Sequence, residues 1–145
     1  HDTDFEKAQR GLTRSDQAIA MATMFLAEHI RVRAIIALTE SGGTARYLSR
    51  FRSDVPIYGL SRHPVARRQM ALMREVTPTV FDSRGMAAHE AARMAIRQLF
   101  GAGALADGDR VLFTSGDSME STGATNTLRL LAVGPDGSAQ GLAAL

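Results

Sequence analysis

The 145-residue chain contains no cysteine and no tryptophan, and Lys7 is its single lysine. Without cysteine there are no disulfides, no thiolate nucleophile and no metal site with cysteine ligands. No apolar run approaches the ~18 residues that cross a bilayer, and the first residues lack the cationic and apolar layout of a signal peptide. We therefore expect a protein that neither spans a membrane nor is secreted, with a cytoplasmic location.

The chain also has little excess of one charge over the other. The 17 basic and 15 acidic residues leave a net charge of only +2. Acidic residues are scattered along the chain, whereas a nucleic-acid binder usually carries a stripe of positive charge, so we expect no nucleic-acid partner. All basic residues except Lys7 are arginine, whose planar guanidinium group also suits phosphate. A phosphorylated small molecule therefore remains open as a ligand.

The apolar residues predict alternating helices and strands. Hydrophobic residues make up 45% of the chain and charged residues 22%, which is typical of one soluble globular domain. Helical spacing is expected at 15–30, 44–51, 64–74 and 86–100, and short apolar runs predict strands at 34–38, 55–60, 76–81, 110–114 and 127–133. Pro56 and Pro78 must occupy a strand start or an unpaired side.

This alternation predicts parallel βαβ units and an α/β fold. We expect a three-layer domain over residues 15–133, with helices on both faces of a five-stranded, mostly parallel sheet. No helix is predicted between the last two strands, so the last strand should be antiparallel at one edge. Residues 1–14 are expected to form an N-terminal extension or linker, and residues 134–145, rich in turn formers, a loose tail.

Two polar loops follow predicted strands. Thr39–Thr44 joins a strand to a helix through two glycines and three hydroxyl residues, a composition that can surround a phosphate with amide and hydroxyl donors. A plain capped turn explains the same local pattern and is the commoner outcome. The second loop, 115–126, is longer than a hairpin needs. If the strand order reverses between strands 34–38 and 110–114, both loops meet over one crevice.

Several sharper motifs are absent. The chain contains no GxGxxG fingerprint, no GxxxxGK[ST] loop and no G-x-S-x-G nucleophile elbow. Its four histidines lack metal-ligand spacing, so we expect no metal site. Methionines at helical spacing are expected to fill the core. Arg67 and Arg68 could reach a bound phosphate, although a solvated helix face is the commoner role of such a pair.

A set of short motifs resembles the C-terminal domain of pyruvate kinase, in order and at family spacing from about residue 16 to 133. The motifs are Thr39-Glu40-Ser41-Gly42-Gly43-Thr44-Ala45, Ser49-Arg50, Pro56-Ile57, Ser61-Arg62-His63, Val76-Thr77-Pro78 and Gly123-Ala124-Thr125-Asn126-Thr127. Ser61-Arg62-His63 and Gly116-Asp117-Ser118-Met119 resemble in particular the bacterial form activated by AMP and sugar monophosphates.

The resemblance implies a domain that regulates a homotetramer by holding a phosphorylated effector. It places the effector phosphate at Thr39, Ser41, Gly42 and Thr44, with Glu40 and Gly43 at variable positions. It places a second effector loop at Asp117, Ser118, Met119, Glu120, Ser121, Thr122 and Gly123. Relatives that bind a bisphosphorylated sugar often carry a basic residue at a variable position, whereas Glu40 is acidic. A monophosphate such as AMP, ribose 5-phosphate or glucose 6-phosphate therefore fits better than fructose 1,6-bisphosphate.

Catalysis is not expected in this segment. In the family, the groups that move phosphate from phosphoenolpyruvate to ADP with Mg²⁺ and K⁺ lie in a preceding barrel domain, which is the expected intramolecular partner. No catalytic residue and no cofactor is assigned here, and the chain alone is predicted inactive. Two alternatives stay open. One is a stand-alone phosphometabolite-binding protein or small enzyme, with Asp117 or Glu120 as acid or base; the other is a structural oligomerisation module whose 39–44 loop is vestigial.

Overall fold

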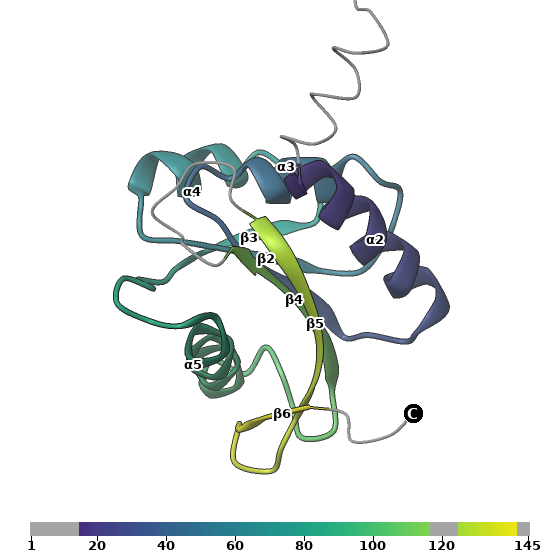
Figure 1. Cartoon of the computed structure of the whole chain (residues 1–145), viewed down its shortest axis with the longest axis vertical. Coiled ribbons are helices and arrows are strands. Elements are labelled where there is room, and N and C mark those ends of the chain that lie inside the picture. Colours follow the sequence, from purple (N-terminus) through teal and green to yellow (C-terminus); the bar gives the residue numbers. More distant parts are fainter. Residues whose placement is uncertain (1–14, 117–124, 142–145) are drawn as a thin grey trace, which may run out of the picture.

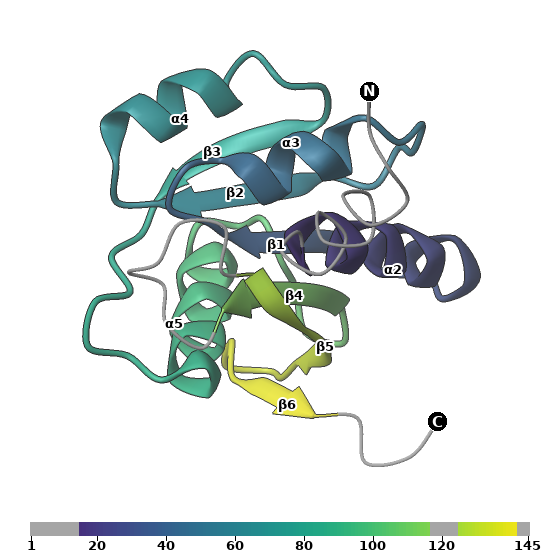
Figure 2. The same ribbon diagram turned by 45° about the horizontal axis from the view of Figure 1, so that its top comes forward.

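A single six-stranded sheet organises the computed structural model, which describes residues 15–116 and 125–141. Its strands run in the order β3-β2-β1-β4-β5-β6, which Figure 2 shows from one edge to the other. In chain order they are β1 (Ala34–Leu38), β2 (Ile57–Ser61), β3 (Val76–Val80), β4 (Arg110–Gly116), β5 (Thr125–Val133) and β6 (Ala139–Gly141). The first four are mutually parallel, and β5 and β6 are antiparallel additions.

Helices cover both faces of this sheet. They are α2 (Ser15–His29), α3 (Gly43–Ser49), α4 (Pro64–Met70) and α5 (Ala88–Gly101). Figure 1 shows α2, α3 and α4 on one face and α5 on the other. Each face has its own buried apolar cluster, one beneath α5 and one beneath the other three helices. The predicted three-layer α/β fold is therefore confirmed.

Strand β1 shows why the sheet is buried on both sides. All five of its residues are buried, with Ile36 and Leu38 in the cluster beneath α5 and Ile35 and Ala37 in the other. Alternation of side chains along a strand makes both faces apolar only when the whole run is apolar, as it is here. β1 lies between β2 and β4 at the centre of the sheet.

The prolines occupy the positions that their missing N–H permits. Pro78 lies in β3, which pairs only with β2 and forms the sheet edge. Pro56 immediately precedes β2, and its carbonyl accepts a hydrogen bond from the amide of Ile35. Both placements agree with the sequence prediction.

The predicted strand count of five is wrong, because β6 follows β5 through a turn at 134–138. The amide of Gly134 donates to the carbonyl of Ser138, and β6 then pairs with the last residues of β5. β6, rather than β5, is therefore the antiparallel edge strand. Three residues carry too weak a hydrophobic pattern to predict a strand, and this one lies within the segment expected to be a loose tail.

Helix α4 is also shorter than predicted. It ends at Met70 instead of Arg74, and the chain then turns through residues 71–75 into β3. Glu75 adopts a φ of 62°, a left-handed conformation that no α-helix continues. The helical spacing of the apolar residues persists beyond this point, so the pattern alone placed the end too late.

Candidate functional site

The reversal of strand order falls between β1 and β4, as the sequence analysis required. The chain leaves β1 toward β2 and β3 on one side, while β4 lies on the other side of β1. Since β1 and β4 are parallel neighbours, their carboxyl ends reach the same edge of the sheet. Ligands of open α/β sheets bind at such a switch point. The 39–44 loop begins there.

The 39–44 loop is held in shape by its own hydroxyl groups. The amide of Gly42 donates to Oγ1 of Thr39 over 2.9 Å, and the amide of Gly43 donates to Oγ of Ser41 over 3.2 Å. Both hydroxyls accept through oxygen and keep their own hydrogen as a donor. Thr39 is buried, whereas Ser41 is exposed.

Gly42 is the residue that allows the loop to turn. Its φ of 87° lies in the left-handed region, where side chains other than glycine are strained. A Cβ at this position would also lie 3.2 Å from Cγ of Met70 on α4. Glycine is therefore needed here for two reasons. The backbone has a positive φ, and the loop packs so closely against α4 that there is little room for a side chain.

Thr44 ties the start of α3 to the start of β5. Its Oγ1 lies 2.8 Å from Oγ1 of Thr125, and both residues are buried. Thr125 lies near the end of the predicted 115–126 loop and is the first residue of β5. The seven residues expected to form the effector loop, 117–123, lie outside the described residues.

Glu40, one of the two variable positions of the 39–44 loop, contacts a histidine and an arginine. Its Oε2 lies 2.6 Å from Nε2 of His63 and 3.5 Å from Nη2 of Arg62. The Oγ of Ser61 donates to the backbone carbonyl of Glu40 and accepts from the amide of His63. The segment Ser61-Arg62-His63 thus wraps around Glu40.

Ser61-Arg62-His63 is one of the motifs of the family resemblance, but its contact with Glu40 was not predicted. A signal was present: both segments end neighbouring strands of the predicted sheet. In the structure Leu38 of β1 lies opposite Leu60 of β2, so the residues that follow leave the sheet side by side. Parallel strands in register would have predicted the contact.

The basic residues near this edge differ in their partners. Arg67 donates from Nη1 to the carbonyl of Ser61 over 2.9 Å, whereas Arg68 is exposed. The Nε of Arg62 is buried and finds no hydrogen-bond partner within the described residues. Arg62 is therefore only partly satisfied by Glu40.

A pocket of about 330 Å³ opens beside Ser41, between the 39–44 loop and the start of α4. It is lined by Glu40, Ser41, His63, Pro64, Val65, Ala66 and Gln69. Its volume lies at the small end of the range of ligand-binding pockets. Within residues 15–116 and 125–141 no three His, Asp or Glu side chains gather in a way that could hold a metal ion.

The comparisons with known proteins agree with this arrangement. Residues 17–131 match the family model described as "Pyruvate kinase, alpha/beta domain". The chain belongs to this family. It is 46% identical to "Pyruvate kinase II" of Salmonella typhimurium, with 81% of the chain and 25% of the relative covered. It is 42% identical to a "Pyruvate kinase" of Buchnera aphidicola, with the same two shares, and 30% identical to "Pyruvate kinase 2" of a Synechocystis species, with 89% and 22% covered.

This pyruvate kinase alpha/beta domain spans about a quarter of the length of those bacterial relatives. The family resemblance read from the sequence is therefore confirmed. None of the helices in the described part of the domain has the length and apolar character of a bilayer span.

Proposed function

We propose that the chain is the regulatory C-terminal domain of a cytoplasmic pyruvate kinase and binds a phosphorylated effector at its 39–44 loop. The observation that carries this proposal is the family match over residues 17–131, combined with the position of that loop at the sheet's switch point. The parent enzyme transfers phosphate from phosphoenolpyruvate to ADP in a separate catalytic domain, where Mg²⁺ and K⁺ would act. The domain also contributes to a homotetramer.

The phosphate site is built from a preformed loop. The hydroxyls of Thr39 and Ser41 already accept hydrogen bonds from backbone amides of the loop. These bonds hold the loop in one conformation before a ligand binds. Preorganised donors lose less entropy on binding than mobile ones. The exposed Ser41 hydroxyl lines the adjacent pocket and donates to the phosphate, while the buried Thr39 and Thr44 hold the loop and α3 in place.

The charges around Glu40 favour a monophosphate. Arg62 attracts an anion, but the Glu40 carboxylate that contacts both Arg62 and His63 already offsets much of this positive charge. A second phosphate would approach that carboxylate and be repelled. AMP, ribose 5-phosphate and glucose 6-phosphate are therefore the preferred effector classes, and fructose 1,6-bisphosphate is disfavoured.

The Thr44–Thr125 hydrogen bond gives the effector a route to the rest of the domain. It joins α3, which follows the 39–44 loop, to β5, which pairs with both β4 and β6. An effector that binds one arrangement of these elements better than another shifts the equilibrium between them. In a tetramer such a shift changes how neighbouring subunits are held.

Calorimetric titration of the 145-residue chain with AMP, ribose 5-phosphate, glucose 6-phosphate and fructose 1,6-bisphosphate tests the effector role. We expect a monophosphate to bind, and Ser41→Ala to weaken it about tenfold, as loss of one hydrogen bond to a charged group predicts. Ser49→Ala is the matched control, because the Ser49 hydroxyl donates to the carbonyl of Arg46 and does not line the pocket beside Ser41. If none of the four ligands binds the chain or its parent enzyme, the structural-module alternative replaces this proposal.

An activity assay separates regulation from catalysis. The chain supplied with phosphoenolpyruvate, ADP, Mg²⁺ and K⁺ should form no pyruvate above the blank. Conversion of a phosphorylated metabolite by the chain alone would favour the small-enzyme alternative.

A further inference from the structure

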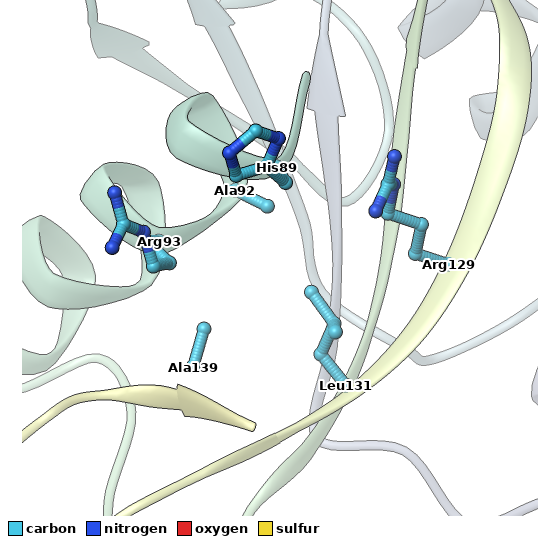
Figure 3. A pocket seen from close by; sticks show the side chains of 6 residues that line it. All are labelled: His89, Ala92, Arg93, Arg129, Leu131 and Ala139. Carbon is cyan, nitrogen blue, oxygen red and sulfur yellow. The ribbon is translucent and has the colours of Figure 1, made fainter. Parts of the chain in front are cut away.

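A second pocket lies on the other side of the sheet, between α5, β5 and β6. It has a volume of about 220 Å³. Its lining consists of His89, Ala92 and Arg93 from α5, Arg129 and Leu131 from β5, and Ala139 from β6. Figure 3 shows Arg93 and Arg129 on opposite sides of the hollow, with His89 near its top and Leu131 and Ala139 below. Neither the 39–44 loop nor α4 contributes to it.

The polar lining of this pocket is entirely basic. It holds two guanidinium groups and one imidazole, and no carboxylate lines it. Neither Arg93 nor Arg129 forms an ion pair with any carboxylate of the described ranges, whereas four other arginines each have one. Those four are Arg33, Arg62, Arg74 and Arg84. In a chain with a net charge of only +2, this is a local excess of positive charge.

Arg129 occupies a position where an apolar residue would be expected. It lies opposite Phe113 of β4, a fully buried residue of the cluster beneath α5, and Leu131 lies two residues further along β5 and packs against the same cluster. Side chains two residues apart on a strand share a face. The chain therefore places a guanidinium group at the margin of an apolar core.

The Nε–H of Arg129 is the second unusual feature of this side chain. The atom is buried and has no hydrogen-bond partner within the described residues. Leaving a buried donor unpaired costs about 1–3 kcal/mol, and more when the group is charged. Such a group in a folded protein calls for a ligand, an ion or a water that satisfies it. The same side chain lines the pocket, so its guanidinium lies partly within the protein and partly at the pocket wall.

We propose that this pocket binds a small doubly charged anion, a phosphate group or a short dicarboxylate, between Arg93 and Arg129. The fork of N–H groups on each guanidinium matches the oxygen pairs of both anion classes. The His89 imidazole supplies a further donor. The apolar floor of Ala92, Leu131 and Ala139 accommodates a short hydrocarbon part. At about 220 Å³ the pocket is below the usual range for drug-sized ligands, so a small anion fits it better than a whole nucleotide.

The site is distinct from the proposed effector site, and it depends on β6. Ala139 reaches the pocket because β6 pairs with Leu131–Val133 of β5. A bound anion would thus hold α5, β5 and β6 together. The histidines provide separate reporters for the two sites, since His89 lines this pocket and His63 lines the pocket beside Ser41.

Proton–carbon NMR of the histidine rings tests the proposal on the full chain. Inorganic phosphate and malonate are titrated separately at constant ionic strength, with chloride as the balancing salt. We expect a saturable shift of the His89 ring signals with at least one of the two anions, while the exposed His29 at the end of α2 follows only the salt. The two arms identify which anion class the site prefers.

Variants establish which side chains bind. Arg129→Gln and Arg93→Gln should each weaken the His89 response about tenfold, as removal of a charge-assisted pair predicts. Arg129→Lys should recover only part of it, because the charge remains but the fork is lost. Arg31→Gln is the matched control, since Arg31 is exposed beyond the end of α2 and does not line the pocket. If Arg129→Gln unfolds the chain, the exposed Arg93 still decides the test.

Two results would overturn the proposal. One is a His89 signal that moves no more than that of His29 with either anion. The other is a saturable response that both arginine variants leave unchanged. The outcome is independent of the effector proposal, because Ser41→Ala should weaken responses at His63, which lines the other pocket, and leave those at His89 intact.

Discussion

Thr44 and Thr125 share a buried hydrogen bond of 2.8 Å although they are 81 residues apart in the chain. The first stands at the start of α3 and the second at the start of β5. Their contact joins the two segments that follow the ends of the central strands β1 and β4. The energy of this bond can therefore be measured as a coupling between the proposed effector loop and β5.

Replacing Thr44 by valine removes the hydroxyl and preserves the side-chain shape. We expect a loss of about 1–2 kcal/mol in the free energy of unfolding, since a buried polar partner is left behind. The double variant Thr44→Val/Thr125→Val should lose less than the sum of the single losses, by about 1 kcal/mol. Urea denaturation of the unmodified chain, the variants Thr44→Val and Thr125→Val, and the double variant measures the four free energies of unfolding.

Thr79→Val serves as the control for this cycle. The Thr79 hydroxyl donates over 3.4 Å to the carbonyl of Thr77 at an exposed position of the edge strand. Its removal should change stability by less than about 0.5 kcal/mol, as is usual at the surface. Additive losses at Thr44 and Thr125 would show that their bond contributes nothing to stability.

Gly42 and Gly85 form a matched pair for testing the loop. Both have positive φ, 87° and 79°, but a Cβ at Gly42 meets Met70 whereas a Cβ at Gly85 meets nothing within 4 Å. Gly85→Ala should cost about 1–2 kcal/mol from backbone strain alone. Gly42→Ala should cost about 1 kcal/mol more, because contact strain is added. Thermal unfolding compares the two.

The Gly42→Ala variant should also weaken effector binding, which Gly85→Ala should leave unchanged. Gly42 shapes the 39–44 loop, while Gly85 lies between β3 and α5, outside both pockets. Equal stability losses for the two variants would contradict the tight packing of the loop against α4.

Glu40→Gln should increase the affinity for fructose 1,6-bisphosphate more than that for a monophosphate. The substitution keeps the shape of the side chain and removes the negative charge that repels a second phosphate. We expect a gain of about three- to tenfold for the bisphosphate, in keeping with a partly screened charge. Glu28→Gln on the exposed side of α2 controls for the change in net charge. An unchanged preference would remove Glu40 as the determinant of effector class.

Asp82 provides a pH test. Arg84 donates to its carboxylate from the side chain, over 2.7 Å at the shortest, and from the backbone amide over 3.1 Å. These hydrogen bonds lower the pKa of Asp82 from 3.8 to about 2. A lowered pKa means that the folded state favours the charged form, so the stabilisation is complete above about pH 4 and is lost as the pH falls through about 2.

Carboxyl carbon NMR should therefore show Asp82 titrating near pH 2 in the native chain. Arg84→Gln should return its pKa toward the ordinary value. Arg74→Gln should leave it unchanged, because Arg74 pairs with Asp54 instead. An Asp82 midpoint that Arg84→Gln does not move would assign the lowered pKa to another cause.

Much of the fold follows from local patterns. The apolar run Ala34–Leu38 predicts a central strand because only a strand covered on both faces can be apolar at every position. The alternation of strands with helices then requires right-handed crossovers and places the 39–44 loop at a carboxyl end. Pro78 predicts an unpaired side, and β3 is indeed an edge strand.

The missed features all depend on partners far away in the chain. Glu40 meets His63 only because β1 and β2 are parallel and in register. Strand β6 has three residues and exists because β5 presents an open edge to it. Nothing in the sequence distinguishes Arg129 from the other arginines, and the burial of its Nε becomes visible only when β5 is paired with β4.

The sequence by itself determined the order and type of the elements, the family, and the loop that follows the central strand, since each is written in the spacing and chemistry of neighbouring residues. The tertiary structure alone decided which charged side chains pair, which hydroxyls form hydrogen bonds within the loop, and where the basic pocket between α5, β5 and β6 lies. These depend on strand register and on the face that each side chain takes. Both are fixed by long-range packing rather than by local preference.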